Sequence, residues 1–313
     1  AGIGMLLSLV WFWFGRAQLK GIGVPAAHQT GMRNVSLVLV FGVLIGIPLF
    51  YALLTIDATL LQGILMALFV IPAVMLLREG VVEGAVARDK VVAMLIIFTF
   101  NVLFWCFFEQ AGSSFNFLAE KIVNRDIGMQ GLFQALAGTH DFPVSWFQSV
   151  NSVAIIVLAP ILAWLWVKMG KNNPIIPRKF GLGLIFNGLA FLLLMVALSS
   201  MVDGSGKIPF WTLFMVYVIQ SVGELCLSPI GLSMTTKLAP ARLAGMAMGC
   251  WFLSIAIGNN LAGIFAGIVS GEGGMSVASA HAGYTFGFYA LVGAGALLFL
   301  IAPLIQRWMH GVK

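Results

Sequence analysis

The sequence contains 313 residues, of which 60% are hydrophobic and only 9% charged, and its mean hydropathy is +1.02. Soluble domains carry about 25% charged residues, so this composition excludes an ordinary soluble protein and indicates a membrane protein with several spans. The formal net charge is +6, but the basic residues are scattered between apolar segments and do not indicate a nucleic-acid partner.

The first residues form an apolar run from Ala1 to Phe14, which is too short to cross a bilayer. No initiator Met and no basic segment precede this run, so it lacks the pattern of a signal peptide. We expect it to be the end of a longer helix, whose earlier part lies outside this sequence.

Eight apolar segments of spanning length follow. They cover residues 36–54, 60–77, 91–118, 146–168, 180–200, 209–236, 243–269 and 284–306. Each is close to the ~20 residues that a helix needs to cross a bilayer. The sequence therefore predicts an all-α, polytopic transmembrane helical bundle.

The basic residues between these segments alternate in a regular way. One set of connections and ends contains Arg16, Lys20, Arg33, Arg78, Arg88, Lys90, Lys168, Lys171, Arg178, Lys179, Lys237, Arg242, Arg307 and Lys313. The opposite connections contain only Lys121, Arg125 and Lys207. Because short cytoplasmic loops are enriched in Lys and Arg, we expect the richer side to be cytoplasmic, and the C-terminus with it.

The sixth apolar segment carries an ionisable carboxylate, Glu224, near its centre. A charge at the centre of a bilayer costs about 2.5 to 3.5 kcal/mol or more. Helical spacing places Tyr217, Ser221 and Ser228 on the same face as Glu224, which would turn this polar stripe toward a bundle interior or a wet cavity. Pro229 permits a bend about one turn later. This pattern predicts a gating helix that binds and releases protons.

The third segment carries a second polar stripe. Asn101, Trp105 and Glu109 follow each other at intervals of four residues, and Gln110 lies beside them. Glu109 and Glu224 lie deep in predicted spans, where this chain has no Lys or Arg at comparable depth. Each acid must be protonated, hydrated or paired with a cation from another part of the protein, which is a physical route to proton coupling. The alternative is a carboxylate that only holds two helices together.

Two further segments add polar and aromatic side chains at helical spacing. They are Gln148 and Asn151 in the fourth segment, and Trp251, Ser254, Gly258 and Asn259 in the seventh. Amides, hydroxyls and Trp rings suit a zwitterionic or amide ligand without demanding one shape. We expect a shared cavity among these helices, although any single amide could instead tie two helices together.

The sequence shows no pattern of an enzyme or a metal protein. Cys106, Cys226 and Cys250 lie inside apolar segments without Cys-x-x-Cys spacing, which is typical of buried thiols. No segment combines a nucleophile with a base, or two carboxylates with a nearby His. We therefore expect no enzyme activity, no metal, and no cofactor beyond protons as the coupling ion.

Small residues recur at the spacing that lets membrane helices approach closely. The pairs are Gly42 with Gly46, Gly245 with Gly249, and Gly263 with Gly267. We expect them to lie at helix contacts of a tightly packed bundle.

Four sequence blocks carry a resemblance to a known family. They are FWCFFEQAGSS at 104–114, QSVN at 148–151, GEL at 223–225 with SPIGLS at 228–233, and GCWFLS at 249–254. With these blocks in this order, the chain resembles the proton-dependent oligopeptide transporters, a branch of the major facilitator superfamily. The resemblance covers nearly the whole chain.

The resemblance implies a domain organisation. Residues 1–16 would be the end of the sixth helix, 17–90 a cytoplasmic linker with the two transmembrane helices that bacterial members insert, and 91–313 the C-terminal six-helix bundle of helices seven to twelve. The family's first-helix Glu-x-x-Glu-Arg motif would lie before Ala1. So would the fourth-helix Lys that pairs with the acid at the position of Glu224.

The resemblance also implies roles for single residues. Glu109 matches an acid of proton handling, Asn151 an amide that binds the peptide backbone, and Glu224 an acid near the peptide amino terminus and the inner gate. Trp251 matches an aromatic residue of the pocket. Some relatives have two consecutive acids in the seventh helix, where this chain has Phe108 before Glu109.

Residues and resemblance together predict a proton-coupled symporter of di- and tripeptides in a bacterial inner membrane. Its expected partners are the peptide, the bilayer and an N-terminal six-helix half of the same protein. The expected peptide site comprises Trp105, Glu109, Asn151, Glu224, Ser228 and Trp251, with Pro229 in gating and Gln110, Gln148, Tyr217, Ser221, Ser254 and Asn259 as secondary candidates. The alternatives are a carrier of another small solute such as nitrate, or a passive channel or structural membrane subunit.

Overall fold

The computed structural model describes residues 2–19, 32–271 and 273–312, with only the backbone described for Ile3 and residues 32–35. Lys20, Lys313 and the side chain of Arg33, which entered the orientation argument, lie outside the described residues. The described part of the chain is helical apart from its connections, and an isolated β-bridge joins Val123 to Ile208.

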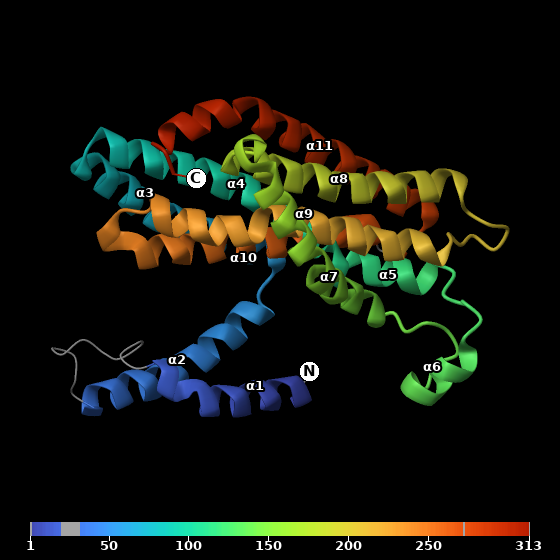
Figure 1. Cartoon of the computed structure of the whole chain (residues 1–313). Coiled ribbons are helices and arrows are strands. Elements are labelled where there is room, and N and C mark those ends of the chain that lie inside the picture. Colours follow the sequence, from blue (N-terminus) through green and yellow to red (C-terminus); the bar gives the residue numbers. More distant parts are fainter. Residues whose placement is uncertain (1, 20–31, 272, 313) are drawn as a thin grey trace. The chain divides into compact units, whose positions relative to one another are not determined.

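The long helices follow the apolar segments in order (Figure 1). They are α1 (Gly2–Gly15), α2 (Met32–Thr55), α3 (Ala58–Glu83), α4 (Ala85–Phe108), α7 (Trp146–Met169), α8 (Ile176–Ser200), α9 (Phe210–Leu238), α10 (Ala244–Ser270) and α11 (Val277–Trp308). The shorter elements are the α-helices α5 (Ser114–Lys121) and α6 (Gln130–Ala137) and the 3₁₀ helices η1 (Arg16–Leu19), η3 (Glu109–Gly112), η4 (Gly170–Asn172) and η5 (Ala241–Leu243).

Eight of the described helical stretches are long and apolar enough to cross a membrane. Each coincides with one predicted segment, which confirms the all-α, polytopic bundle. Several helices run beyond the apolar segment that predicted them; the last occupies Val277–Trp308 instead of 284–306. Hydropathy identifies the lipid-spanning centre of a helix but not the polar turns that continue it. It also did not predict α6, a short helix in the connection at 119–145.

Contacts along the chain define two compact units, Ala1–Ile56 and Asp57–Lys313. The smaller unit contains α1 and α2. In the larger unit, α3 packs against α4 and α10, so it belongs to the same compact body as the six helices that follow it. That α2 and α3 together form an insertion between two halves stays a prediction.

Within the larger unit, α8 lies along α11 on one side and α9 on another (Figure 1). Glycines make this packing possible. A Cβ on Gly183 would lie 2.9 Å from the carbonyl oxygen of Gly223, and one on Gly181 would lie 3.0 Å from the carbonyl oxygen of Gly295. The helix backbones therefore touch at these crossings, as is common between membrane helices.

The glycine pairs expected from their spacing do not make such contacts. A Cβ added to Gly245, Gly249, Gly263 or Gly267 would meet no atom within 4 Å in the described part of the chain, and one on Gly42 would meet none within the smaller unit. One on Gly46 would meet only Phe50 of its own helix. For the two pairs of the larger unit the prediction was wrong, because four-residue spacing identifies a helix face without identifying a neighbour. For Gly42 and Gly46 it stays a prediction. Gly181, Gly183, Gly223 and Gly295, whose backbones touch at the crossings, have no glycine four residues away.

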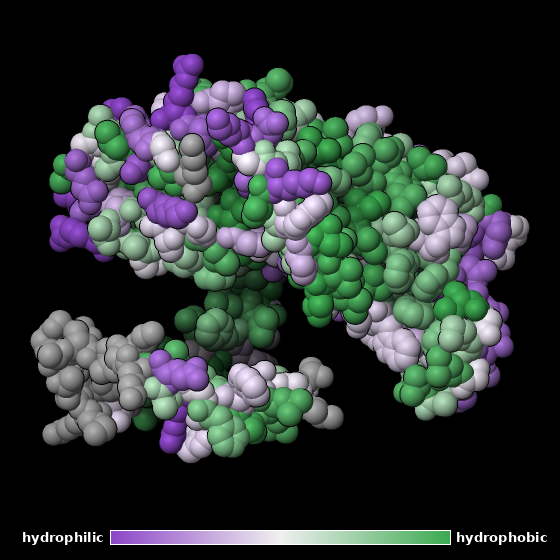
Figure 2. Space-filling view, viewed as in Figure 1, coloured by the Kyte–Doolittle hydropathy of each residue, from purple (hydrophilic) through white to green (hydrophobic). Residues whose placement is uncertain are grey.

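Aromatic side chains fill much of the core. The ring of Trp251 packs edge-on against Phe98 and Phe180, at centroid distances of 5.6 and 6.2 Å. Tyr284 packs against Phe115 and Phe191 in a second cluster. On the surface of the larger unit, hydrophobic side chains form a broad zone and hydrophilic ones gather toward its ends (Figure 2). This distribution is the one expected of helices that cross a bilayer.

Candidate functional site

A polar cavity of about 220 Å³ opens where the end of α4 and η3 face α7 and α9. Its walls combine a carboxylate, three side-chain amides and a phenol with a few apolar groups. They are formed by Phe108, Glu109, Ala111, Gly112, Gln148, Asn151, Tyr217 and Gln220. The structure thus brings together residues from the third, fourth and sixth predicted spans, as the shared-cavity hypothesis requires.

Glu109 lies where the third span changes its winding. The α-helix α4 ends at Phe108, and the chain continues as the 3₁₀ helix η3 before α5 begins at Ser114. A 3₁₀ stretch inside a longer helical span often marks a functional hinge. The Glu109 side chain is half-buried and lines the cavity. Glu109 therefore faces the cavity, whereas Asn101 and Trp105 of the same predicted stripe face α10.

Asn151 joins α7 to the acid of α9. Its Nδ2 donates hydrogen bonds to Ser221 Oγ and to Glu224 Oε2, both at 3.0 Å. Ser221 Oγ in turn donates to the carbonyl oxygen of Tyr217 at 2.7 Å. Both amide hydrogens of Asn151 are engaged in this way, which orients its Oδ1 away from Glu224. The predicted stripe Tyr217, Ser221 and Glu224 is thus one connected polar network.

Two secondary candidates complete the walls of the cavity. The Tyr217 hydroxyl donates to the carbonyl oxygen of Ala111 at 3.0 Å and so ties α9 to η3. Gln148 Nε2 donates to Asn116 Oδ1 at 3.3 Å. Tyr217 thus fixes α9 relative to η3, and Gln148 fixes α7 relative to α5.

Gln220 was missed as a site residue, although it lies in the same polar stretch. It is 1% exposed and lines the cavity. Its Nε2 donates to Asn187 Oδ1 at 2.9 Å, and Asn187 Nδ2 donates to the carbonyl oxygen of Phe104 at 3.2 Å. Gln220 could have been found from the sequence because it lies four residues before Glu224, on the same face of the helix. Asn187 could have been found because it is a side-chain amide in an otherwise apolar segment.

Three predicted site residues lie in the core between α4 and α10. Trp105 Nε1 donates to Asn101 Oδ1 at 3.1 Å, and Asn101 Nδ2 donates to Ser254 Oγ at 2.8 Å. Trp251 is 1% exposed, and its indole lies so close over Gly231 that a Cβ there would overlap it. In this structure Trp105, Ser254 and Trp251 hold helices together and do not line the cavity.

The remaining candidates also lie away from the cavity walls. Gln110 Nε2 donates to the carbonyl oxygens of Cys106 and Ala262, at 2.9 and 3.1 Å, and so ties η3 to α10. Ser228 is half-buried, and Pro229 and Asn259 are exposed. The gating role of Pro229 stays a prediction, since α9 continues as one helix from Phe210 to Leu238.

The electrostatic character of the site is acidic. Glu109 lines the cavity, and Glu224 accepts a hydrogen bond from Asn151 of the same wall, so two carboxylates serve one site. No Lys or Arg is among the residues that line the cavity. Over the described residues, no group of three His, Cys, Asp or Glu side chains is placed to hold a metal ion. The site can therefore bind protons or a cationic donor and does not attract an anion.

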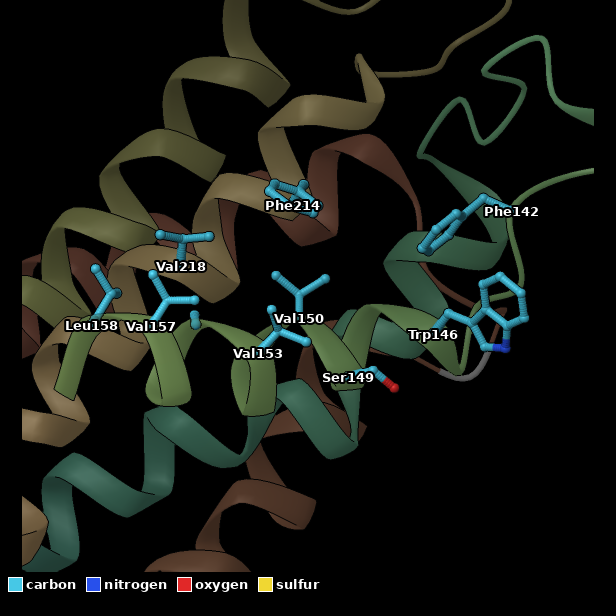
Figure 3. Close-up of a pocket in the computed structure, with 10 residues that line it drawn as sticks. Phe142, Trp146, Ser149, Val150, Val153, Val157, Leu158, Phe214 and Val218 are labelled. Atoms are coloured by element: carbon cyan, nitrogen blue, oxygen red, sulfur yellow. The ribbon is translucent and has the colours of Figure 1, made fainter. Parts of the chain in front are cut away.

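A larger groove of about 460 Å³ lies between α7 and α9 on another face (Figure 3). Valines 150, 153, 157 and 218 line it, with Phe214 and the aromatic rings of Phe142 and Trp146 near the start of α7 (Figure 3). Its lining is almost wholly apolar, and no carboxylate lies in it. It offers no chemistry for binding a zwitterion, so the smaller polar cavity is the candidate site.

Comparison with known proteins adds independent findings. The family model described as "PTR2: POT family" matches residues 1–275. The transporter YclF of Bacillus subtilis is 31% identical over 100% of this chain and 61% of its own length. Dipeptide and tripeptide permease B of Aeromonas hydrophila is 27% identical over 99% of this chain and 61% of its own.

Solved structures show the same relationship. A peptide transporter POT in complex with sulfate is 30% identical, with a TM-score of 0.72, over 99% of this chain and 61% of that one. The chain thus spans about 61% of the length of these relatives.

Proposed function

The chain belongs to the POT family of transporters, and we propose that it forms the C-terminal part of a symporter that carries di- and tripeptides together with protons. A multi-pass membrane protein of a transporter family is not an enzyme. The peptide substrate is proposed from the relatives, one of which is named a dipeptide and tripeptide permease. The bacterial inner membrane and a cytoplasmic C-terminus are part of the same proposal.

The observation that carries the proposal is the pairing of two acids with amides around one polar cavity. Glu109 lines the cavity, and Asn151 links its wall to Glu224 at 3.0 Å. Carboxylates held inside a membrane bundle are costly and mark proton or substrate pathways. Amide groups beside them can exchange their internal hydrogen bonds for bonds to a peptide backbone.

Coupling follows from the chemistry of Glu224. An ionised carboxylate accepts strong, charge-assisted hydrogen bonds and attracts a cation, whereas a protonated one does neither as well. We propose that Glu224 pairs with a Lys of the N-terminal half when the cytoplasmic gate is closed. Peptide and proton binding would weaken that contact and release the gate. The helices would bend at two places, the 3₁₀ helix η3 that begins at Glu109 and the position of Pro229 in α9.

Two other functions fit the site less well. A nitrate carrier needs a fixed cation where the anion binds, and the described cavity is lined by an acid and neutral groups. A passive channel would conduct its solute without a proton gradient. Uptake into dye-loaded vesicles after the gradient is collapsed distinguishes a channel from a symporter.

The test of the proposed function is replacement of Glu224 in the complete gene product, reconstituted in proteoliposomes. Glu224→Gln keeps the shape and an acceptor for Asn151 but cannot release a proton. We expect accumulation of a labelled dipeptide driven by a pH gradient to fall to background, while dipeptide counterflow is partly kept. Glu120→Gln, at an exposed site in α5, is the matched control and should accumulate peptide like the wild type. Unchanged accumulation by Glu224→Gln would refute the assignment.

A further inference from the structure

The short helix α6 carries an apolar stripe that the described residues leave open. Leu132 and Leu136 lie one turn apart on this helix and are 45% and 65% exposed, and Met129, directly before its first turn, is exposed as well. In Figure 2 hydrophobic residues accordingly gather over α6. Large apolar side chains that share one side of a helix normally mark the side that contacts something other than water.

One edge of the same apolar face is fixed to the protein. Phe133 is buried, and its ring packs edge-on against Phe142 and Trp146, at centroid distances of 5.7 and 6.0 Å. Phe142 in turn contacts the ring of Phe210 at 5.0 Å. Arg125 Nη1 donates to the carbonyl oxygen of Phe142 at 2.8 Å. This cluster holds α6 against the larger unit at a defined place.

The aromatic cluster lies where two membrane spans begin. Trp146 is the first residue of α7 and Phe210 the first of α9, and both helices are long and apolar enough to cross a membrane. The ends of spanning helices lie at the boundary between headgroups and acyl chains, where Trp residues are enriched. Trp211, next to Phe210, is a second exposed Trp at this end. Contact with Trp146 and Phe142 therefore places α6 at the level of this boundary.

The side chains of α6 fit that level. The segment between Asp126 and His140 contains no Asp, Glu, Lys or Arg. Its glutamines, Gln130 and Gln134, are exposed, and Gln134 lies about 200° around the helix from Leu136. A helix with one apolar and one polar face can lie along a bilayer surface. Because α6 is uncharged, apolar contact alone would hold it there, without a need for anionic lipids.

We propose that α6 is an interfacial membrane anchor, whose stripe of Met129, Leu132 and Leu136 inserts at the boundary between the headgroups and the acyl chains of the leaflet in which α7 begins. Lipid is the apolar material that this level of the membrane supplies, and the glutamines on the opposite side of α6 face water. The anchor holds the start of α7 at a fixed depth. This is the helix that carries Gln148 and Asn151 of the polar cavity.

The test places a fluorescent probe on either side of α6 in the purified complete gene product, in nanodiscs of phosphatidylcholine. Leu136→Cys and its control Gln134→Cys are each labelled with an environment-sensitive maleimide dye. The parent protein, whose described cysteines are buried, gives the background. We expect lipids with a nitroxide near the headgroup to quench the Leu136 probe about twofold or more above the Gln134 probe, and aqueous iodide to show the reverse preference. A nitroxide at the end of the acyl chain should quench less, since such helices reach only about 5–10 Å into the boundary.

Two results would overturn the inference. Equal quenching of both probes by iodide, with no effect of the nitroxide lipids, would show that α6 faces water. Protection of the Leu136 probe from both quenchers would show that protein covers the stripe, either another part of the same chain or a second copy. If Leu136→Cys does not fold, Leu132→Cys on the same stripe is measured with the same expectations.

The lipid composition gives an independent check. Adding phosphatidylglycerol to the nanodiscs should leave the quenching of the Leu136 probe unchanged, because α6 itself carries no charge. Quenching that appears only with this anionic lipid would mean that charged residues outside α6 make the contact, and it would contradict an apolar anchor.

Discussion

The bond between Asn151 and Glu224 is the residue-scale feature on which the site depends. It connects a neutral amide of α7 to an acid of α9 over 3.0 Å, and the same Nδ2 also serves Ser221. A hydrogen bond to a charged group is stronger than one between neutral groups. Both partners are only half-buried, so water offsets part of its strength. The bond can therefore hold α7 and α9 together and still be exchanged for a bond to a ligand.

This reasoning predicts the coupling between the two residues. Asn151→Leu and Glu224→Met should each lower the thermal unfolding midpoint of the purified protein. The double variant should lose less than the sum, with a coupling of about 1 kcal/mol, because either change alone already removes the bond. A control pair, Gln148→Leu with Glu224→Met, joins residues between which the structure gives no hydrogen bond and should be additive. Strict additivity for Asn151 and Glu224 would contradict the described contact.

At the same scale, the sequence singled out Glu109 and three neutral wall residues, Gln148, Asn151 and Tyr217, but it missed Gln220. Glu109 and Glu224 were identifiable because an acidic side chain deep in an apolar span is costly and is usually functional. Gln220 was passed over because a neutral amide is cheaper to bury and gives a weaker signal. Trp251 lies in the core instead, since a polar or aromatic stripe does not fix the rotation of α10 about its axis. Only contacts with specific neighbours, such as Gly231, determine that rotation.

At the scale of elements, hydropathy sufficed to predict where helices span, but not how they touch. The eight segments were predictable because each must bury an apolar length of about 20 residues in lipid. The winding change at Glu109–Gly112 has no signal in hydropathy, and neither Gly183 nor Gly223, which touch, has a glycine four residues away. Such features depend on local geometry and on contacts between helices, neither of which hydropathy records.

The crossing of α8 and α9 allows a direct test. Gly183→Ala would place a Cβ 2.9 Å from the carbonyl oxygen of Gly223, and the clash is with backbone that cannot rotate away. We expect the helices to separate slightly and the protein to lose about 1 to 3 kcal/mol of stability, seen as a lower thermal unfolding midpoint. Gly293→Ala in α11, where a Cβ meets nothing within 4 Å, should be neutral. An equal effect at both positions would contradict the packing.

At the scale of the whole molecule, the direction of transport depends on which ends of the helices face the cytoplasm. The basic residues predict that the connection after α7, with Lys171, is cytoplasmic and that the connection after α8, with Lys207, is on the other side. A cytoplasmic gate at the α9 end toward Lys237 requires this same orientation. If the orientation were reversed, the gate that Glu224 is proposed to control would open to the outside.

Single introduced cysteines decide this question. Cys106, Cys226 and Cys250 are buried, so a membrane-impermeant maleimide should label the parent protein weakly in intact cells. Lys171 and Ser205 are both exposed at the ends of neighbouring spans. We expect Ser205→Cys to react in intact cells, and Lys171→Cys to react only after the membrane is permeabilised. The opposite pattern would place the C-terminus outside the cell and invert the gate, because the connections that carry Lys171 and the C-terminus are separated by an even number of spans.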